Sequence, residues 1–130
     1  MRQDVMAIEI LLIGDVATTT RRLNELRLRG YNTWLATTEA ELTWLLEKAS
    51  ARPSHAIVDL STENPERAWV LGARAAVATL AHLPTILIGA QGGEARHFQR
   101  VIASFPAPPT TDDVIGALLR EAGTMRKPRS

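Results

Sequence analysis

The chain of 130 residues contains no cysteine. Disulfide bonds and thiolate metal sites are therefore excluded, and the composition fits a reducing compartment, so we expect a cytoplasmic protein. No apolar run approaches the ~20 residues that a membrane-spanning helix needs. The first residues, MRQD, are not followed by the long apolar region of a signal peptide. We expect no membrane association.

The chain also lacks a strong charge of either sign. Fifteen Lys and Arg residues face fourteen Asp and Glu residues, which gives a formal net charge of +1. This balance does not favour nucleic acid or a membrane surface as a partner. With 45% hydrophobic and 22% charged residues, the chain is typical of a globular domain. We expect one domain over residues 1–124, followed by a basic tail or the start of a linker at 125–130.

Short apolar segments recur along the sequence and predict five strands. They lie at residues 8–13, 31–35, 55–60, 85–89 and, more weakly, 103–105. The first, third and fourth are nearly continuous Ile, Leu and Val, which is typical of strands covered on both faces. The second is more mixed and indicates an edge strand.

Helical patterns separate these strands. Apolar periodicity and end signals predict helices at 20–29, 38–49, 64–82 and 94–102 and a last helix from 111. Thr38 and Glu41 have the spacing of a capping box. Gly30 is a typical C-terminal signal for the first helix. The buried stripe of the last helix is predicted to be Ile115, Leu118, Leu119 and Ala122.

This alternation predicts a doubly wound, flavodoxin-like α/β fold. A parallel five-stranded sheet in the order 2-1-3-4-5, with helices on both faces, is the expected solution. Ligands of such sheets bind beyond the carboxyl ends of the strands, where the strand order reverses. Gly14 and Asp15 follow the first strand, and Asp59 ends the third. We therefore expect two carboxylates to converge there.

Four segments resemble the CheY-like receiver domains of two-component response regulators. They are ILLIGD at 10–15, HAIVDL at 55–60, LPTILIGA at 83–90 and APPTTDDV at 107–114. In that family an acidic pair after the first strand helps to hold Mg²⁺. An aspartate at the end of the third strand accepts a phosphoryl group from a histidine kinase. A Thr or Ser after the fourth strand and a Lys after the fifth contact that group.

The resemblance puts Asp59 at the phosphoacceptor position and Asp15 at the second acid of the pair. The other family positions are altered: Gly14 replaces the first acid, Gly89 the hydroxyl residue, Ala107 the lysine and Ser104 the switch aromatic. The resemblance thus implies a receiver scaffold with a degenerate site, a pseudo-receiver. It also implies a cis bond between Ala107 and Pro108, because the family's Lys–Pro bond is commonly cis.

The losses weaken both metal and phosphoryl binding. Mg²⁺ is usually held by one or two carboxylates, so Asp15 and Asp59 together allow at most a weak site. An equally good interpretation is that helix N-terminal amides satisfy both acids. Phosphoryl transfer depends on positioning and charge stabilisation, and residue 107 carries no cation. No other cofactor is expected.

We expect a signalling module that acts through protein–protein contacts, without catalysis and without phosphorylation. Its partner would be a sensor kinase, an output domain, another regulator or a second copy of the chain. The alternative is a genuine phosphoacceptor receiver, phosphorylated on Asp59 with Mg²⁺. A small flavodoxin-like cofactor-binding protein is less favoured, because residues 14–20 hold no phosphate-binding pattern.

Two surfaces are candidates for partner contacts. The first is an interaction face formed by Arg96, His97, Arg100 and Pro108, with Ser104 beside them. The second is a cluster of arginines on the first helix, at 21, 22, 27 and 29, which is commonly a solvated face but also suits an acidic partner.

Overall fold

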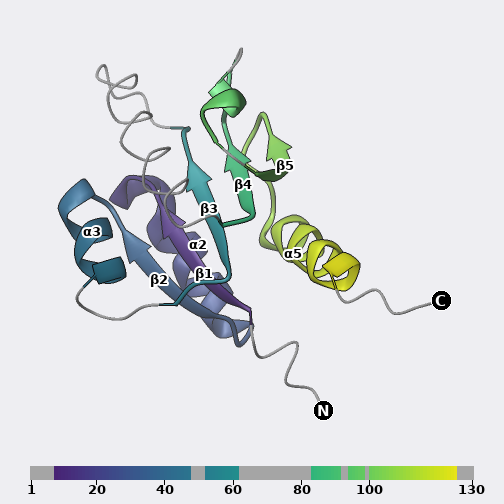
Figure 1. Ribbon diagram of the computed structural model, residues 1–130, viewed down its shortest axis with the longest axis horizontal. Coiled ribbons are helices and arrows are strands. Elements are labelled where there is room, and N and C mark those ends of the chain that lie inside the picture. Colours follow the sequence, from purple (N-terminus) through teal and green to yellow (C-terminus); the bar gives the residue numbers. More distant parts are fainter. Residues whose placement is uncertain (1–7, 48–51, 62–82, 92–93, 99, 126–130) are drawn as a thin grey trace.

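The computed structural model describes residues 8–47, 52–61, 83–91, 94–98 and 100–125. Five strands, three α-helices and one short 3₁₀ helix, η1, lie in these ranges (Figure 1). In chain order they are β1 (Glu9–Ile13), α2 (Val16–Leu28), β2 (Asn32–Ala36), α3 (Glu39–Glu47), β3 (His55–Asp59), β4 (Thr85–Ile88), η1 (Glu94–His97), β5 (Val101–Phe105) and α5 (Thr111–Met125). The predicted helix at 64–82 and residues 126–130 of the predicted tail lie outside the described residues.

All five strands are parallel and follow the order β2-β1-β3-β4-β5. The predicted flavodoxin-like topology is therefore confirmed, including the edge position of β2. Ile13 at the end of β1 pairs with Ala36 on one side and Val58 on the other. The carboxyl ends of these three strands consequently meet at one edge of the sheet.

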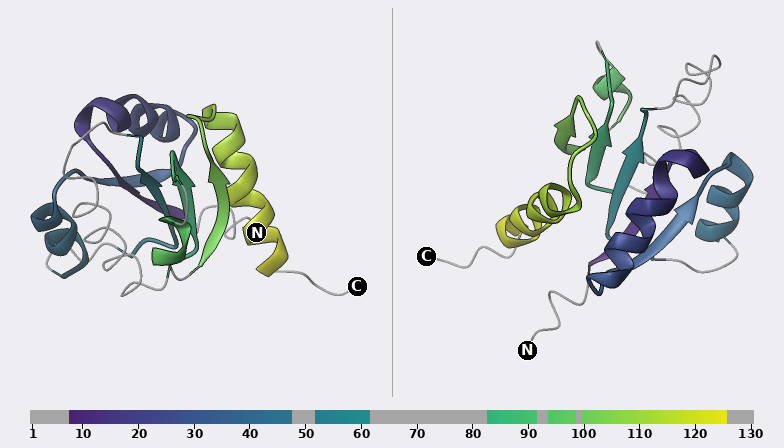
Figure 2. Two further views of the ribbon diagram at one scale, coloured as in Figure 1. Left: turned by 90° about the horizontal axis from the view of Figure 1, so that it is seen from above. Right: turned by 180° about the vertical axis from the view of Figure 1, so that it is seen from behind.

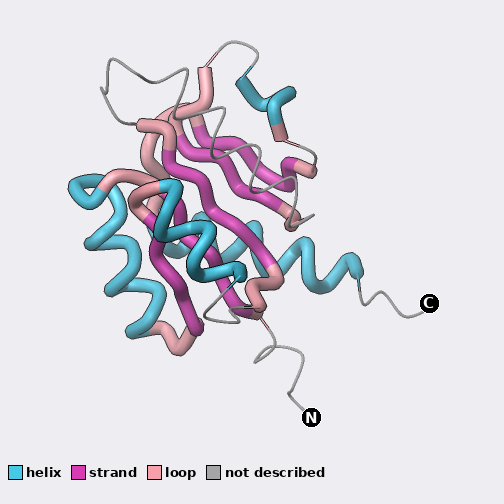
Figure 3. The backbone as a smooth tube through the Cα atoms, turned by 60° about the vertical axis from the view of Figure 1, so that its left-hand side comes forward, coloured by secondary structure: helices cyan, strands magenta, loops and turns pink. Residues whose placement is uncertain are grey.

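Helices cover both faces of the sheet, as predicted. Because side chains alternate along a strand, β1 sends Leu11 and Ile13 to the face of α3 and Ile10 and Leu12 to the opposite face. α2 and α5 pack side by side on that opposite face (Figures 2 and 3). Each fully buried aliphatic side chain stabilises the fold by about 1.5–3 kcal/mol. In the described residues no helix is long and apolar enough to cross a membrane.

α2 begins at Val16, four residues before the predicted start. The backbone carbonyl of Asp15 accepts hydrogen bonds from the amides of Thr18 and Thr19 and from the Thr19 hydroxyl, so the helix forms directly after β1. The sequence obscured this start, because residues 16–20 are mostly β-branched and have low helix propensity. Its end is as predicted, at Gly30 with φ of 90°.

The helix predicted at 94–102 is wrong in its second half. Only η1 forms, and Val101 and Ile102 belong to β5. Val101 pairs with Thr85 and Ala103 with Ile86, so Ile102 is an extra residue in the ladder. Pairing with β4 outweighs the local helical pattern here.

The buried stripe of α5 is centred about one residue earlier than predicted, although Leu118 is buried as predicted and Ile115 and Ala122 are partly buried. Val114, Ala117 and Leu118 are buried, whereas Leu119 is 42% exposed, so its predicted burial is wrong. The fourth buried position of the stripe is Glu121. Because Glu121 is charged, the i, i+3, i+4, i+7 pattern that begins at Val114 could not be recognised from apolar residues alone.

Candidate functional site

The carboxyl edge of the sheet brings together the residues that follow β1 and end β3. Gly14 comes directly after the Ile13–Val58 pair, so it lies beside Asp59. A Cβ atom at position 14 would lie 2.5 Å from the Thr19 methyl carbon and 3.0 Å from the Asp59 Cβ. A side chain at Gly14, the position predicted to match the family's first acid, would therefore collide with Thr19 and crowd Asp59. Asp15, the next residue, is the N-cap of α2.

Asp59 ends β3 and is only 3% exposed. Its Oδ1 accepts hydrogen bonds from the Ser61 amide at 2.9 Å and from the Ser61 hydroxyl at 2.5 Å. Ser61 was not predicted as a site residue. An aspartate followed two residues later by a hydroxyl residue is typical of a local side-chain turn, which was the available signal. The side chain at the predicted phosphoacceptor position is thus buried and hydrogen-bonded by its own loop.

Gly89, at the family's hydroxyl position, is packed against the same serine. Its φ is 77°, and a Cβ atom there would lie 2.9 Å from both the Cα and the N of Ser61. Its amide donates to the Phe105 carbonyl at 2.7 Å, which fixes its place after β4. A Thr or Ser at 89 would require this loop to move.

The loop after β5 carries no compensating cation. Ala107 and Pro108 are both exposed. The expected cis bond between them is wrong, since the described residues contain no cis peptide. The loop is attached to α2 instead, because an Arg22 NH2 group donates to the Pro109 carbonyl at 3.0 Å. The trans form is the more stable one for an X–Pro bond in general.

The donor set at this edge does not match a receiver metal site. In the described part of the chain no three His, Asp or Glu residues are grouped so that they could hold a metal ion. The first acid is absent at Gly14, and Oδ1 of Asp59 is already bound by two donors from Ser61. Weak Mg²⁺ binding by Asp15 and Asp59 stays a prediction.

Part of the predicted interaction face is exposed to solvent, and part of it makes contacts within the chain. The side chains of Arg96, Ser104 and Pro108 are exposed, and that of His97 lies outside the described residues. Arg100 is half exposed, but its NH2 donates to Oε2 of Glu121 at 2.7 Å. This cation therefore has a structural contact as well as a surface position.

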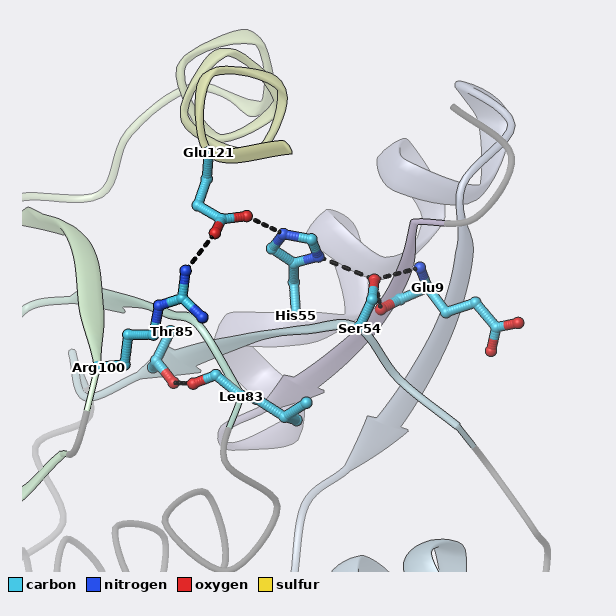
Figure 4. Close-up of polar contacts among 7 residues, drawn as sticks. All are labelled: Glu9, Ser54, His55, Leu83, Thr85, Arg100 and Glu121. Atoms are coloured by element: carbon cyan, nitrogen blue, oxygen red, sulfur yellow. Dashed lines mark hydrogen bonds and ion pairs between the residues drawn. The ribbon is translucent and has the colours of Figure 1, made fainter. Parts of the chain in front are cut away.

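A buried polar network lies at the opposite edge of the sheet (Figure 4). Nε2 of His55 is 2.7 Å from Oε1 of Glu121, and both side chains are less than a tenth exposed. Nδ1 of His55 is 2.8 Å from the Ser54 hydroxyl, which also accepts from the Glu9 amide and donates to the Glu9 carbonyl. Ser54, His55 and Glu121 are hydrogen-bonded in series. The serine hydroxyl, however, is also hydrogen-bonded to both the amide and the carbonyl of Glu9. The network fits a structural role for His55, joining α5 to the sheet.

No family model and no curated protein matches the chain. Solved structures do. A CheY-like receiver domain protein from Methanospirillum hungatei is similar with a TM-score of 0.65 and 19% identity, over 93% of this chain and 98% of that one. A receiver domain protein from Clostridium thermocellum is similar with a TM-score of 0.61 and 16% identity, over 92% of this chain and 97% of that one.

The receiver domain of the hybrid histidine kinase CckA has a TM-score of 0.59 and 20% identity, over 88% of this chain and 98% of its own. In each comparison the similarity extends along almost the whole length of both chains, and it agrees with the observed strand order. The chain therefore has the CheY-like, flavodoxin-like fold of the response-regulator receiver domains.

Proposed function

We propose that the chain is a signal-transduction module of receiver type that acts through protein–protein contacts and does not depend on phosphorylation. The observation that carries this proposal is the state of Asp59, which is buried and bound through Oδ1 by Ser61. A phosphoryl donor would have to displace Ser61 before it reached this oxygen.

The surroundings of Asp59 add to this barrier. Phosphoryl transfer is catalysed by positioning and by stabilisation of charge. Here Gly89 contributes no hydroxyl, Ala107 contributes no cation, and Gly14 contributes no acid for a metal ion. The family's lysine position holds Ala107, so it supplies no positive side chain to match the negative charge of a phosphoryl group on Asp59, which disfavours both the formation and the persistence of that group.

The partners we propose are a sensor kinase, an output domain, another regulator or a second copy of the chain. Support comes from the similar structures, which include the receiver of a hybrid histidine kinase and a receiver-modulated diguanylate cyclase. Both pair a receiver with a second signalling component. The exposed Arg96, Ser104 and Pro108 provide the proposed contact surface.

The second candidate function is a phosphoacceptor receiver. The position of Asp59 favours it, because Asp59 ends β3 at the carboxyl edge, next to the residues that follow β1. A beryllofluoride-activated receiver of NtrC is among the similar structures.

Beryllofluoride, a phosphoryl mimic, separates the two candidates. We would titrate it into ¹⁵N-labelled protein with millimolar Mg²⁺ and follow the amides of Ser61 and Gly89. The proposal predicts no saturable shift. Saturable shifts in the native chain that are absent in Asp59→Asn would show that the phosphoacceptor function is correct.

A further inference from the structure

A groove of about 510 Å³ lies between α2 and the segment that joins β5 to α5, and it does not include Asp59. Its walls include Arg21, Arg22 and Leu28 of α2 and Pro108, Thr110 and Asp112 of the opposite side. Leu28 is 86% exposed, so it adds an apolar surface to a groove rich in charge. Small-molecule sites have volumes of about 300–1,000 Å³ and combine apolar walls with a few polar groups.

Three guanidinium groups and two carboxylates line the groove, which leaves one positive charge. Two of the guanidinium groups are already paired: Arg21 with Glu25 at 3.1 Å and Arg29 with Asp112 at 2.6 Å. The Thr111 hydroxyl, followed by Arg21, holds the pKa of Glu25 below its ordinary value, so Glu25 stays a carboxylate. The charge of Arg22 also helps to lower the pKa of Glu25, but among the described residues Arg22 forms no ion pair with a carboxylate.

Arg22 is held in place by one bond and is otherwise unsatisfied. Its NH2 donates to the Pro109 carbonyl at 3.0 Å. Its Nε and NH1 are buried and have no acceptor in the part of the chain that the structure describes. Buried donors on a charged group cost free energy when they are left unpaired, and native proteins rarely leave them so. An acceptor from outside the chain would remove this cost.

We propose that this groove binds a small molecule through a carboxylate or phosphate group, with Arg22 as the anchor. Both groups offer several oxygens to the planar guanidinium, which can bind them through two parallel hydrogen bonds. Nε and NH1 are buried in the ligand-free conformation, so we expect binding to rotate the outer part of the Arg22 side chain and to exchange its bond to the Pro109 carbonyl for bonds to the anion. Leu28 and Pro108 would contact the apolar part of the molecule.

The test uses phenyl phosphate and benzoate, which carry the two candidate groups on the same apolar body. Benzyl alcohol provides the uncharged comparison. Each is titrated into ¹⁵N-labelled protein at constant ionic strength, and the amides of Leu28, Thr110 and Thr111 and the Nε–H of Arg22 are followed. We expect saturable shifts with at least one of the two anions and none with the alcohol. The stronger anion identifies the natural group as phosphate or carboxylate.

Arg27 offers a matched control on the same helix. It also donates one NH2 hydrogen bond to a backbone carbonyl, that of Thr33 at 2.9 Å, but it does not line the groove. Arg22→Gln should weaken anion binding about tenfold or more, because a charged hydrogen bond is lost. Arg27→Gln should leave the affinity within about twofold. Circular dichroism checks that both variants fold, and Arg22→Lys, expected to bind several-fold more weakly, replaces Arg22→Gln if that variant does not.

Several results would overturn the proposal. Equal losses in Arg22→Gln and Arg27→Gln would show general attraction to the positive charge of α2. Equal shifts with benzyl alcohol would show a purely apolar contact. No shift with either anion up to its solubility limit would exclude the ligand site.

Discussion

Two glycines of this chain have similar backbone conformations but very different surroundings. Gly30 has φ of 90°, and a Cβ atom added there would meet no other atom within 4 Å. Gly89 has φ of 77°, and a Cβ atom added there would lie 2.9 Å from the backbone of Ser61. An alanine at either position suffers the strain of positive φ, about 1–2 kcal/mol. Only Gly89→Ala also forces two backbones apart.

We therefore predict that Gly30→Ala lowers the free energy of unfolding by about 1 kcal/mol and Gly89→Ala by about 3 kcal/mol or more. Urea denaturation of both variants measures the difference, which isolates the crowding at Ser61. Equal losses would mean that the loop after β4 moves aside easily, and the argument against a hydroxyl at position 89 would fail.

Glu41 provides a second prediction at the level of single residues. The Thr37 amide donates to its Oε1 at 2.7 Å and the Thr37 hydroxyl at 2.8 Å, and together they lower the pKa of Glu41 below its usual 4.5. Because the folded pKa is lower than the unfolded one, this carboxylate stabilises the fold above pH 4.5. That contribution is lost as the pH falls through the folded pKa.

Thr37→Val keeps the amide and removes the hydroxyl, so we predict that the pKa of Glu41 rises part of the way toward its ordinary value. Carboxyl ¹³C shifts measured against pH report this change directly. Thr20→Val is the control, because the Thr20 hydroxyl donates to the Val16 carbonyl and contacts no carboxylate. A Glu41 pKa that does not respond to Thr37→Val would assign the whole shift to the backbone amide.

At the scale of elements, Glu121 is the residue through which α5 is joined to two parts of the sheet. It binds His55 at the start of β3 and Arg100 just before β5, each at 2.7 Å. We predict that Glu121→Ala destabilises the fold by about 1–3 kcal/mol, because it leaves a buried imidazole without its partner. Arg100→Ala should cost less, about 0–1 kcal/mol, since this arginine is half exposed.

Thermal unfolding of the two variants and of His55→Ala ranks these contacts. Leu119→Ala is a control on the same helix, because Leu119 is largely outside the core. If Arg100→Ala were the most destabilising, the exposed ion pair would hold α5 and the buried His55 contact would be secondary.

The same elements show what the sequence could predict. Strands β1, β3 and β4 were predictable because parallel strands buried on both faces are nearly continuous apolar runs rich in Ile, Leu and Val. β5 was predicted only at 103–105, and its first two residues were missed because its burial is partial and its start depends on pairing with β4. The one-residue shift in α5 came from Glu121, a charged side chain whose partners are distant in sequence.

The candidate site divides in the same way. Strand ends are local properties, so the positions of Asp15, Asp59 and Gly89 at the carboxyl edge followed from the predicted topology. The bond from Arg22 to the Pro109 carbonyl joins residues 87 positions apart, and no local pattern indicates it. The same holds for the close approach of Gly89 to Ser61, which requires the backbone paths of two loops.

At the scale of the whole molecule, the chain has the receiver fold, and we propose that the chemistry of its carboxyl edge differs from that of a phosphorylated receiver. A ligand shifts an equilibrium between two conformations only through its different affinities for them. If Asp59 is not phosphorylated, phosphorylation cannot change the conformation of the surface around η1 and β5. We then expect this surface to stay in one state, with control exerted by the amount of the partner.

This expectation leads to a prediction about association, either of the chain with itself or with a kinase or output domain. Asp59→Ala should leave the dissociation constant within about twofold, because Asp59 lies buried at the sheet edge. Arg96→Glu combined with Ser104→Glu should weaken association about tenfold, since both side chains are exposed on the proposed contact surface. Arg100 is left unchanged, because a glutamate at position 100 would lie beside Glu121 and would destabilise the fold as well as the surface. Sedimentation velocity measures each constant. Loss of association in Asp59→Ala, with the Arg96 and Ser104 variant unaffected, would mean that Asp59 controls the surface after all and that the phosphoacceptor function is the correct one.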